Sequence, residues 1–106
     1  MDAKRIRFER TGGFAGIRIG ADFDLEDLPE EQADQIREML DDVDFAELPE
    51  KLMKGRPIPD GFTYSITVES ERAEYTVTTS DTSAPEKMQP LLELLYQIAR
   101  QRARKK

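Results

Sequence analysis

The sequence contains no histidine, no cysteine and no tryptophan among its 106 residues. Histidine is the commonest general base, cysteine is the usual thiol nucleophile, and both are the preferred ligands of zinc. A carboxylate enzyme would need two acidic side chains converging in an apolar cleft, and no pattern in the sequence indicates one. We therefore expect a protein that is not an enzyme and that carries no metal or cofactor of its own.

Long hydrophobic runs are also absent. No stretch approaches the roughly 18 apolar residues of a membrane span, and the first ten residues, MDAKRIRFER, lack the apolar centre of a secretory signal. The lack of cysteine excludes a disulfide framework. These absences predict a cytoplasmic protein that does not bind membranes. We also expect a monomer, although no pattern in the sequence determines the oligomeric state.

Charge is abundant and unevenly distributed. The net charge is −6, and residues 22–50 hold thirteen of the 22 acidic residues but only one basic residue, Arg37. This acidic block would repel phosphate, so we expect no nucleic-acid binding. The last seven residues, RQRARKK, carry five positive charges; this basic tail is either a solvated helix end that complements the helix dipole or a binding tail.

Alternating apolar residues predict a first β-hairpin over residues 4–23. The adjacent glycines Gly12 and Gly13 supply the positive φ angles of a two-residue turn. Such a turn sets Ile6 opposite Ile19 and places Arg7 opposite Arg18 on the outer face. Two opposed arginines are either screened by salt or form a surface for an acidic partner.

An amphipathic helix is predicted over 29–43, with Pro29 at its start and an apolar stripe ending at Val43. A long loop follows over 44–61, in which PEKLMK could form one helical turn. A second hairpin is predicted over 62–80, with Val68 opposite Tyr75 and Ile66 opposite Val77.

A second helix is predicted over 84–102, opened by a capping box from Ser83 to Glu86. Pro90 either kinks this helix or marks its true start. Residues 1–3 are expected to be a flexible N-terminus and 103–106 a basic tail. The pattern ββα-ββα predicts a single α+β domain, with four antiparallel strands and two helices packed on one face of the sheet.

Two segments stand out as candidate partner-binding sites. The loop GRPIPDG, with Ile58, Pro59 and Asp60, is either a stiff connector or a pre-ordered binding loop. The second is an irregular segment around Ile19 to Asp24, at the exit of the predicted strand over 14–23, and it includes Arg18 at its start, Ile19 and Ala21. Phe14 either enters the core through a bulge or is an exposed aromatic anchor.

Several stretches together resemble the emfourins: ERTGGFAGIRI, DLEDLPEEQADQI, DFAELP, DGFTYSITVE and APEKMQPLLELL. That family comprises small cytoplasmic bacterial inhibitors of protealysin-like zinc metallopeptidases of the thermolysin class. The resemblance covers nearly the whole chain, although the basic tail is not typical of it. It implies a non-enzymatic protein whose partner is a thermolysin-like metallopeptidase.

The resemblance gives the candidate residues a possible role. Ile58 would offer an apolar side chain to a thermolysin-like pocket, Asp60 could approach a zinc ion, and Arg18 could meet acidic residues on the protease rim. The alternative is a general interaction or chaperone-like adaptor domain without a protease target. A thermolysin-like peptidase gene beside the gene for this chain would favour inhibition.

Overall fold

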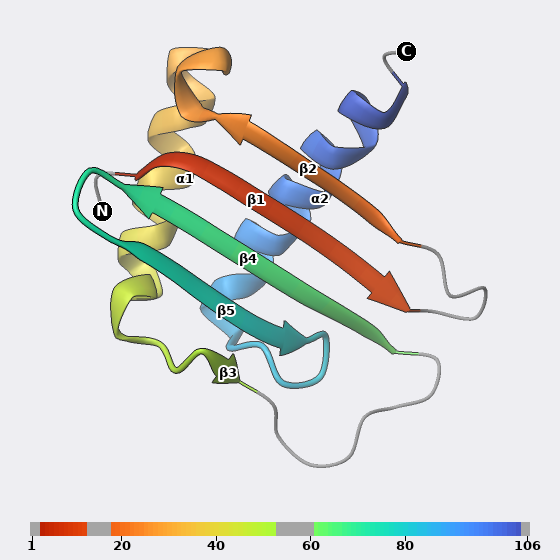
Figure 1. Cartoon of the computed structure of the whole chain (residues 1–106). Helices are drawn as coiled ribbons and strands as arrows, with labels where there is room; N and C mark the ends of the chain where they lie inside the picture. Colours follow the sequence, from red (N-terminus) through yellow and green to blue (C-terminus); the bar gives the residue numbers. More distant parts are fainter. Residues whose placement is uncertain (1–2, 13–17, 53–60, 105–106) are drawn as a thin grey trace.

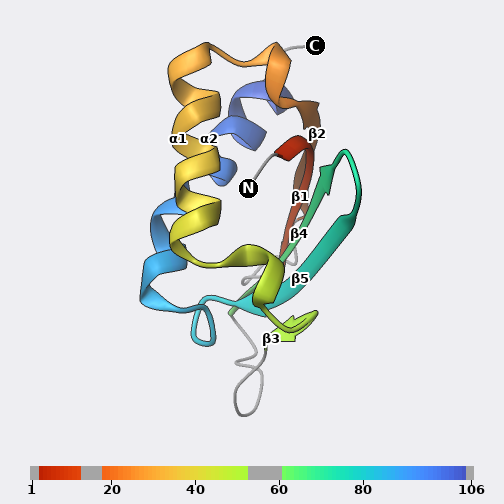
Figure 2. The same ribbon diagram turned by 90° about the vertical axis from the view of Figure 1, so that its left-hand side faces the viewer.

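The computed structural model describes residues 3–12, 18–52 and 61–104. Five strands form one sheet in the order β2-β1-β4-β5-β3. They comprise β1 (Ala3–Gly12), β2 (Ile19–Asp24), β3 (Lys51–Leu52), β4 (Phe62–Ser70) and β5 (Glu74–Ser80). The helices α1 (Glu30–Asp42) and α2 (Gln89–Arg104) both cover the same face of this sheet (Figures 1 and 2).

The predicted α+β class and the two helices are confirmed, but the prediction of four antiparallel strands is wrong. A fifth strand, β3, pairs in parallel with β5, so the sheet is mixed. The Oγ1 of Thr79 donates a 2.8 Å hydrogen bond to the carbonyl oxygen of Leu52. Lys51 and Leu52 are therefore extended rather than part of a helical turn, and the predicted loop over 44–61 contains β3 and a 3₁₀ turn, η2 (Phe45–Glu47).

The register of the second hairpin is confirmed, whereas that of the first is wrong. In the second, Val68 lies opposite Tyr75 and Ile66 opposite Val77. In the first, Ile6 lies opposite Phe23. This register is displaced by four residues from the predicted one, in which Ile6 met Ile19.

Side-chain chemistry explains the observed register of the first hairpin. Arg7 lies opposite the carboxylate of Asp22 instead of opposite Arg18, which replaces like charges by opposite ones. Because the side-chain period of a strand is two, a displacement by four leaves Ile6 and Phe8 on the core face. Arg10 already pairs with Ile19, so a two-residue turn on Gly12 and Gly13 is excluded.

The core lies between the sheet and the two helices. The predicted stripe of α1 is confirmed, because Ala33, Ile36 and Leu40 are at most 4% exposed and Val43 is 7% exposed. From the sheet and α2, the buried residues include Ile6, Phe8, Phe23, Ile66, Val68, Val77, Leu91, Leu92, Leu95, Ile98 and Ala99. Truncating one of these large side chains to alanine would cost about 2–5 kcal/mol.

The starts of two elements, β1 and α2, differ from the prediction. Ala3 is completely buried, pairs with Ser70 in β4, and accepts 3.4 Å hydrogen bonds from Nε and Nη2 of Arg37. It is therefore part of β1 and not of a flexible terminus. Burial of a backbone carbonyl requires such a donor, and the single arginine of the acidic block provides it.

The second difference concerns the start of α2. A 3₁₀ turn, η3 (Glu86–Met88), has Pro85 as its N-cap with no side-chain cap, and α2 begins after it at Gln89. The predicted capping box on Ser83 is therefore wrong. Pro90 falls in the first turn of α2, where its missing N–H has no helical partner to lose.

Candidate functional site

The register brings both candidate segments to one end of the sheet. Gly12, the last residue of β1, pairs with Phe62, the first residue of β4. At the same end, Arg10 pairs with Ile19 and Leu52 pairs with Thr79. The chain therefore leaves the described structure toward 13–17 and toward 53–60 from neighbouring positions (Figure 1). We call this end, with Arg10, Gly12, Arg18, Leu52, Gly61 and Phe62, the platform.

An arginine held between aromatic rings stabilises the platform. The guanidinium carbon of Arg10 lies 3.5 Å from the centre of the Phe62 ring and 4.1 Å from that of Tyr96. Both rings lie within the range of a cation–π interaction. Arg10 thereby joins β1, β4 and α2.

Burial around Arg10 also changes the pKa of its neighbour Tyr64. Removal from water raises the pKa of the Tyr64 phenol, and the positive charge of Arg10 opposes this rise. The Nε of Arg10 is itself buried without a hydrogen-bond partner. The guanidinium is stacked against the rings of Phe62 and Tyr96 and also interacts with the Tyr64 phenol.

Close backbone contact fixes the platform on its other side. Gly12 has φ +107°, and a Cβ added there would lie 2.5 Å from the carbonyl oxygen of Gly61. No other residue type fits both the angle and the space. The roots of the two candidate segments are thus in direct contact through Gly12 and Gly61.

Three of the predicted partner-binding residues lie in or beside β2. The Arg18 side chain is 72% exposed, and its Nε lies 3.5 Å from Oε2 of Glu9. Ile19 and Ala21 are half-buried and pack against the core. They belong to a regular edge strand and not to an irregular exit.

The other four predicted residues, Phe14, Ile58, Pro59 and Asp60, lie outside the described residues. Their proposed roles stay predictions. The alternatives for Phe14, a core residue or an exposed anchor, stay open for the same reason.

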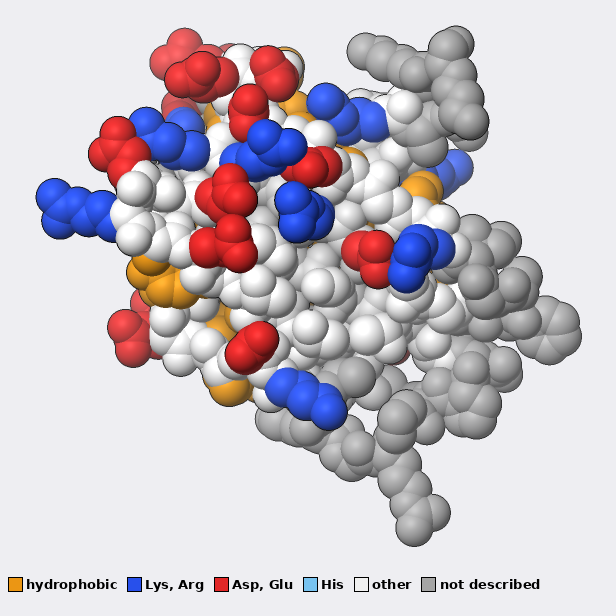
Figure 3. Space-filling model, in the orientation of Figure 1, with side chains coloured by type: hydrophobic (Ala, Val, Ile, Leu, Met, Phe, Trp, Pro, Cys, Tyr) orange, Lys and Arg blue, Asp and Glu red, His pale blue; other side chains and the backbone are white. Residues whose placement is uncertain are grey.

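The arginines of the outer sheet face are neutralised within the molecule. The Nε of Arg5 donates a 2.7 Å hydrogen bond to Oδ1 of Asp22, and the Nε of Arg7 lies 3.6 Å from Oδ2 of the same carboxylate. The hydrogen bond from Arg5 lowers the pKa of Asp22 and raises that of Arg5. Lys and Arg side chains alternate with Asp and Glu on this face (Figure 3).

This pairing corrects the predicted opposition of Arg7 and Arg18, because Asp22 lies opposite Arg7. It also gives Asp22, the first residue of the acidic block over 22–50, a partner within the sheet. Among the residues that the structure describes, no group of three or more Asp or Glu side chains could hold a metal ion. No helix in the described ranges is long and apolar enough to span a membrane.

Sequence reasoning missed the Arg10 stack, although the pattern contained a signal for it. Arg10 lies on the core-facing side of β1, as Ile6 and Phe8 do. Phe62 and Tyr64 lie on the core-facing side of β4, as Ile66 does. An arginine in a core-facing position near a strand end, opposite aromatic residues, indicates a stacked guanidinium.

The fold and the platform define the class: a small α+β protein whose sheet carries a rigid end from which two connecting segments leave. Comparison of the sequence with known families then gives the family. The family model for Emfourin matches residues 8–96, and the chain belongs to the Emfourin family. This membership confirms the predicted resemblance and the expectation that the chain is not an enzyme.

Two further comparisons were made with individual proteins. A solved structure, Emfourin (M4in) from Serratia proteamaculans, an M4 family peptidase inhibitor, is similar to this chain with a TM-score of 0.48 and 21% sequence identity. The similarity covers 89% of each chain. No curated protein sequence matches this chain significantly.

Proposed function

We propose that this protein inhibits a zinc metallopeptidase of the M4, thermolysin-like family. The observation that carries the proposal is the family match over residues 8–96. The Serratia protein that bears the family's name is an M4 family peptidase inhibitor. The target of this chain is proposed at the level of that peptidase family and not of one enzyme.

The platform is the surface that we propose faces the peptidase. A protein inhibitor binds tightly when its contact segments lose little freedom on binding. The roots of the segments over 13–17 and 53–60 are fixed by the Arg10–Phe62 stack and by the contact of Gly12 with Gly61. Arg18 stands exposed beside them, and on binding its guanidinium would exchange Glu9 for an acidic residue on the rim of the peptidase.

A titration of thermolysin with the purified chain tests the proposal. Residual hydrolysis of a fluorogenic peptide is measured at a fixed enzyme concentration, and other M4 peptidases are tested in parallel. We expect activity to fall with added chain and to vanish near equimolar concentration for at least one of them. Subtilisin, a serine peptidase, provides the control and should keep its activity.

Gel analysis of the same mixtures shows whether the chain is an inhibitor or only a substrate that competes with the fluorogenic peptide. A true inhibitor is recovered intact after prolonged incubation, whereas a competing substrate is cleaved and activity returns. If no M4 peptidase loses activity at micromolar chain, the proposed function is wrong and the adaptor alternative becomes the better hypothesis.

A further inference from the structure

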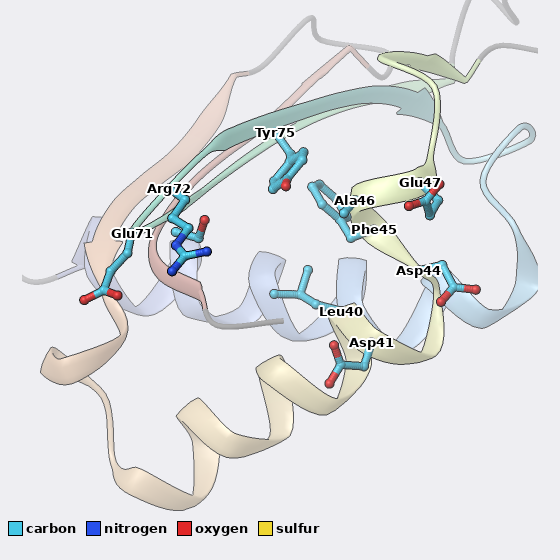
Figure 4. Close-up of a pocket in the computed structure, with 10 residues that line it drawn as sticks. Leu40, Asp41, Asp44, Phe45, Ala46, Glu47, Glu71, Arg72 and Tyr75 are labelled. Carbon is cyan, nitrogen blue, oxygen red and sulfur yellow. The ribbon is translucent and has the colours of Figure 1, made fainter.

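A groove lies at the opposite end of the sheet from the platform. Its main cavity, of about 670 Å³, is enclosed by the end of α1, by η2 and by the turn between β4 and β5 (Figure 4). β4 has nine residues, so Ser70 at this end lies eight positions from Phe62, a distance of roughly 26 Å along the strand. A molecule bound in the main cavity would therefore leave the platform accessible.

The floor of the groove is apolar. Leu40 and Phe45 form its base and are at most 1% exposed, while the half-buried Tyr75 forms one wall (Figure 4). A second cavity of about 290 Å³ shares Phe45 and Tyr75 with the first and continues to Leu48 and Val77. The two cavities together make an elongated groove that suits an extended chain with apolar side chains.

The rim of the groove is acidic. Six exposed carboxylate residues line the two cavities: Asp41, Asp44, Glu47, Glu50, Glu71 and Glu74. Among the described lining residues, Arg72 is the only cation, and Lys4 from outside the groove lies 3.0 Å from Glu71. The rim therefore keeps a negative excess that attracts positive charge.

Local hydrogen bonds hold both sides of the rim in place. In the β4–β5 turn, the backbone N–H of Ser70 donates to the carbonyl of Ala73 at 2.8 Å, and the Ser70 hydroxyl accepts from Ala73 N–H at 3.2 Å. Across the groove, the N–H of Glu47 donates to the carbonyl of Asp44 at 2.8 Å. The groove is thus formed before any ligand arrives, which lowers the entropic cost of binding.

We propose that this groove binds a short basic peptide segment of a partner protein. Apolar side chains of the segment would contact the half-buried Leu48 and Tyr75, while its Lys or Arg side chains would pair with the carboxylates of the rim. Charge complementarity selects this occupant, since an acidic segment would be repelled by the same carboxylates. The inference does not depend on peptidase inhibition.

Three synthetic hexapeptides provide the test: KLKLKL, KSKSKS and ELELEL, each blocked at both ends. They are titrated into ¹⁵N-labelled full-length chain, and the amide shifts are followed by NMR. We expect KLKLKL to move the amides of Ala46, Glu47, Arg72 and Tyr75, KSKSKS to bind more weakly at the same place, and ELELEL to have no effect. Raising the salt concentration should weaken KLKLKL binding.

A charge-neutral variant makes the test specific. Asp44→Asn with Glu47→Gln should weaken KLKLKL binding roughly five- to tenfold, because two exposed ion pairs are lost. Asparagine suits position 44, whose φ of +51° is left-handed. The matched control, Glu26→Gln with Asp27→Asn in the 3₁₀ turn η1 (Leu25–Asp27), removes the same charge elsewhere and should bind like the parent.

Three outcomes would overturn the proposal. The first is equal weakening of KLKLKL by the rim variant and the control, which would mean general charge attraction. The second is the absence of shifts around the groove at millimolar KLKLKL. The third is concentration-dependent shifts of the groove amides without peptide, because the occupant would then be a second copy of this chain.

Discussion

The guanidinium carbon of Arg10 lies 3.5 Å above the centre of the Phe62 ring, so the end of β1 is stacked on the start of β4. Tyr96 of α2 covers Arg10 at 4.1 Å. The stack lies where two connecting segments leave the sheet. Its removal should lower the free energy of unfolding by a measurable amount.

Arg10→Lys should lower the free energy of unfolding by about 1–2 kcal/mol, because lysine keeps the charge but loses the flat surface that stacks on two rings. Urea denaturation at neutral pH measures this. Arg7→Lys is the matched control, since Arg7 is 65% exposed, and should change stability by less than about 0.5 kcal/mol. Equal stability of the two variants would show that the stack contributes nothing.

Gly12→Ala should destabilise the protein by more than about 2 kcal/mol. The new Cβ would combine an unfavourable φ of +107° with a 2.5 Å approach to the carbonyl oxygen of Gly61. At Gly20 the added Cβ would lie 3.0 Å from the carbonyl oxygen of Phe8, without a positive φ, so Gly20→Ala should cost less. Thermal unfolding of the two variants gives the order, and the reverse order would contradict the geometry.

Thr79→Val should cost about 1 kcal/mol, because it removes the hydroxyl that donates to the carbonyl of Leu52 and leaves the buried shape unchanged. Amide exchange at Thr78, whose N–H donates to the carbonyl of Glu50, should become faster as β3 detaches. Thr76→Val on the outer face serves as the control. If exchange at Thr78 is unchanged, β3 is held by other contacts.

The stability of the Asp22–Arg5 pair should depend on pH. Hydrogen bonding from Arg5 lowers the pKa of Asp22 below its ordinary value of 3.8 in the folded state. The pair therefore stabilises the protein above that value, and the contribution is lost as the pH falls below it. Asp22→Asn should be less stable than the parent at pH 7, by no more than about 1 kcal/mol because the pair is solvent-screened. The difference between the urea midpoints should shrink as the pH falls below 3.8, and a difference that stays constant would refute the assignment.

Ile58→Ala and Asp60→Ala should each weaken inhibition of the peptidase that the parent inhibits, with nearly unchanged thermal stability. The expectation comes from the sequence, because an apolar side chain and a carboxylate between prolines suit a thermolysin-like cleft. Inhibition constants of the two variants are compared with that of Pro49→Ala, an exposed position outside the segment. Full inhibition by both variants would make the segment a connector and leave Phe14 and Arg18 as the candidates.

The sequence predicts which side chains of a strand face the core better than it predicts which residues pair between neighbouring strands. Alternation assigns Ile6 and Phe8 to the core correctly, because a period of two determines the face of a strand but not its pairing partner. The second hairpin has a short turn that restricts the register, and there Val68 and Tyr75 were paired correctly. The first hairpin has a connection over 11–18, and the glycine pair suggested a tighter turn than the register permits.

The features missed from the sequence depend on residues far apart in the chain. β3 has only two residues, which is too short for any periodic signal, and it exists because Thr79 and Glu50 provide partners across the sheet. The Arg10 stack needs Phe62 and Tyr96, which only the fold brings together. The peptide groove likewise arises where η2 meets the β4–β5 turn.

The central position of β1 has a consequence for synthesis of the protein. β1 lies between β2 and β4, and Ile6 finds its neighbour Val68 only 62 positions later. A nascent chain that has just emerged with its first hairpin therefore has one edge of β1 open and no helix α2 to cover its apolar face. Because pairing between distant strands is slow to form, the sheet closes only after β4 and β5 have been synthesised, and truncated chains that stop before β4 should aggregate rather than fold.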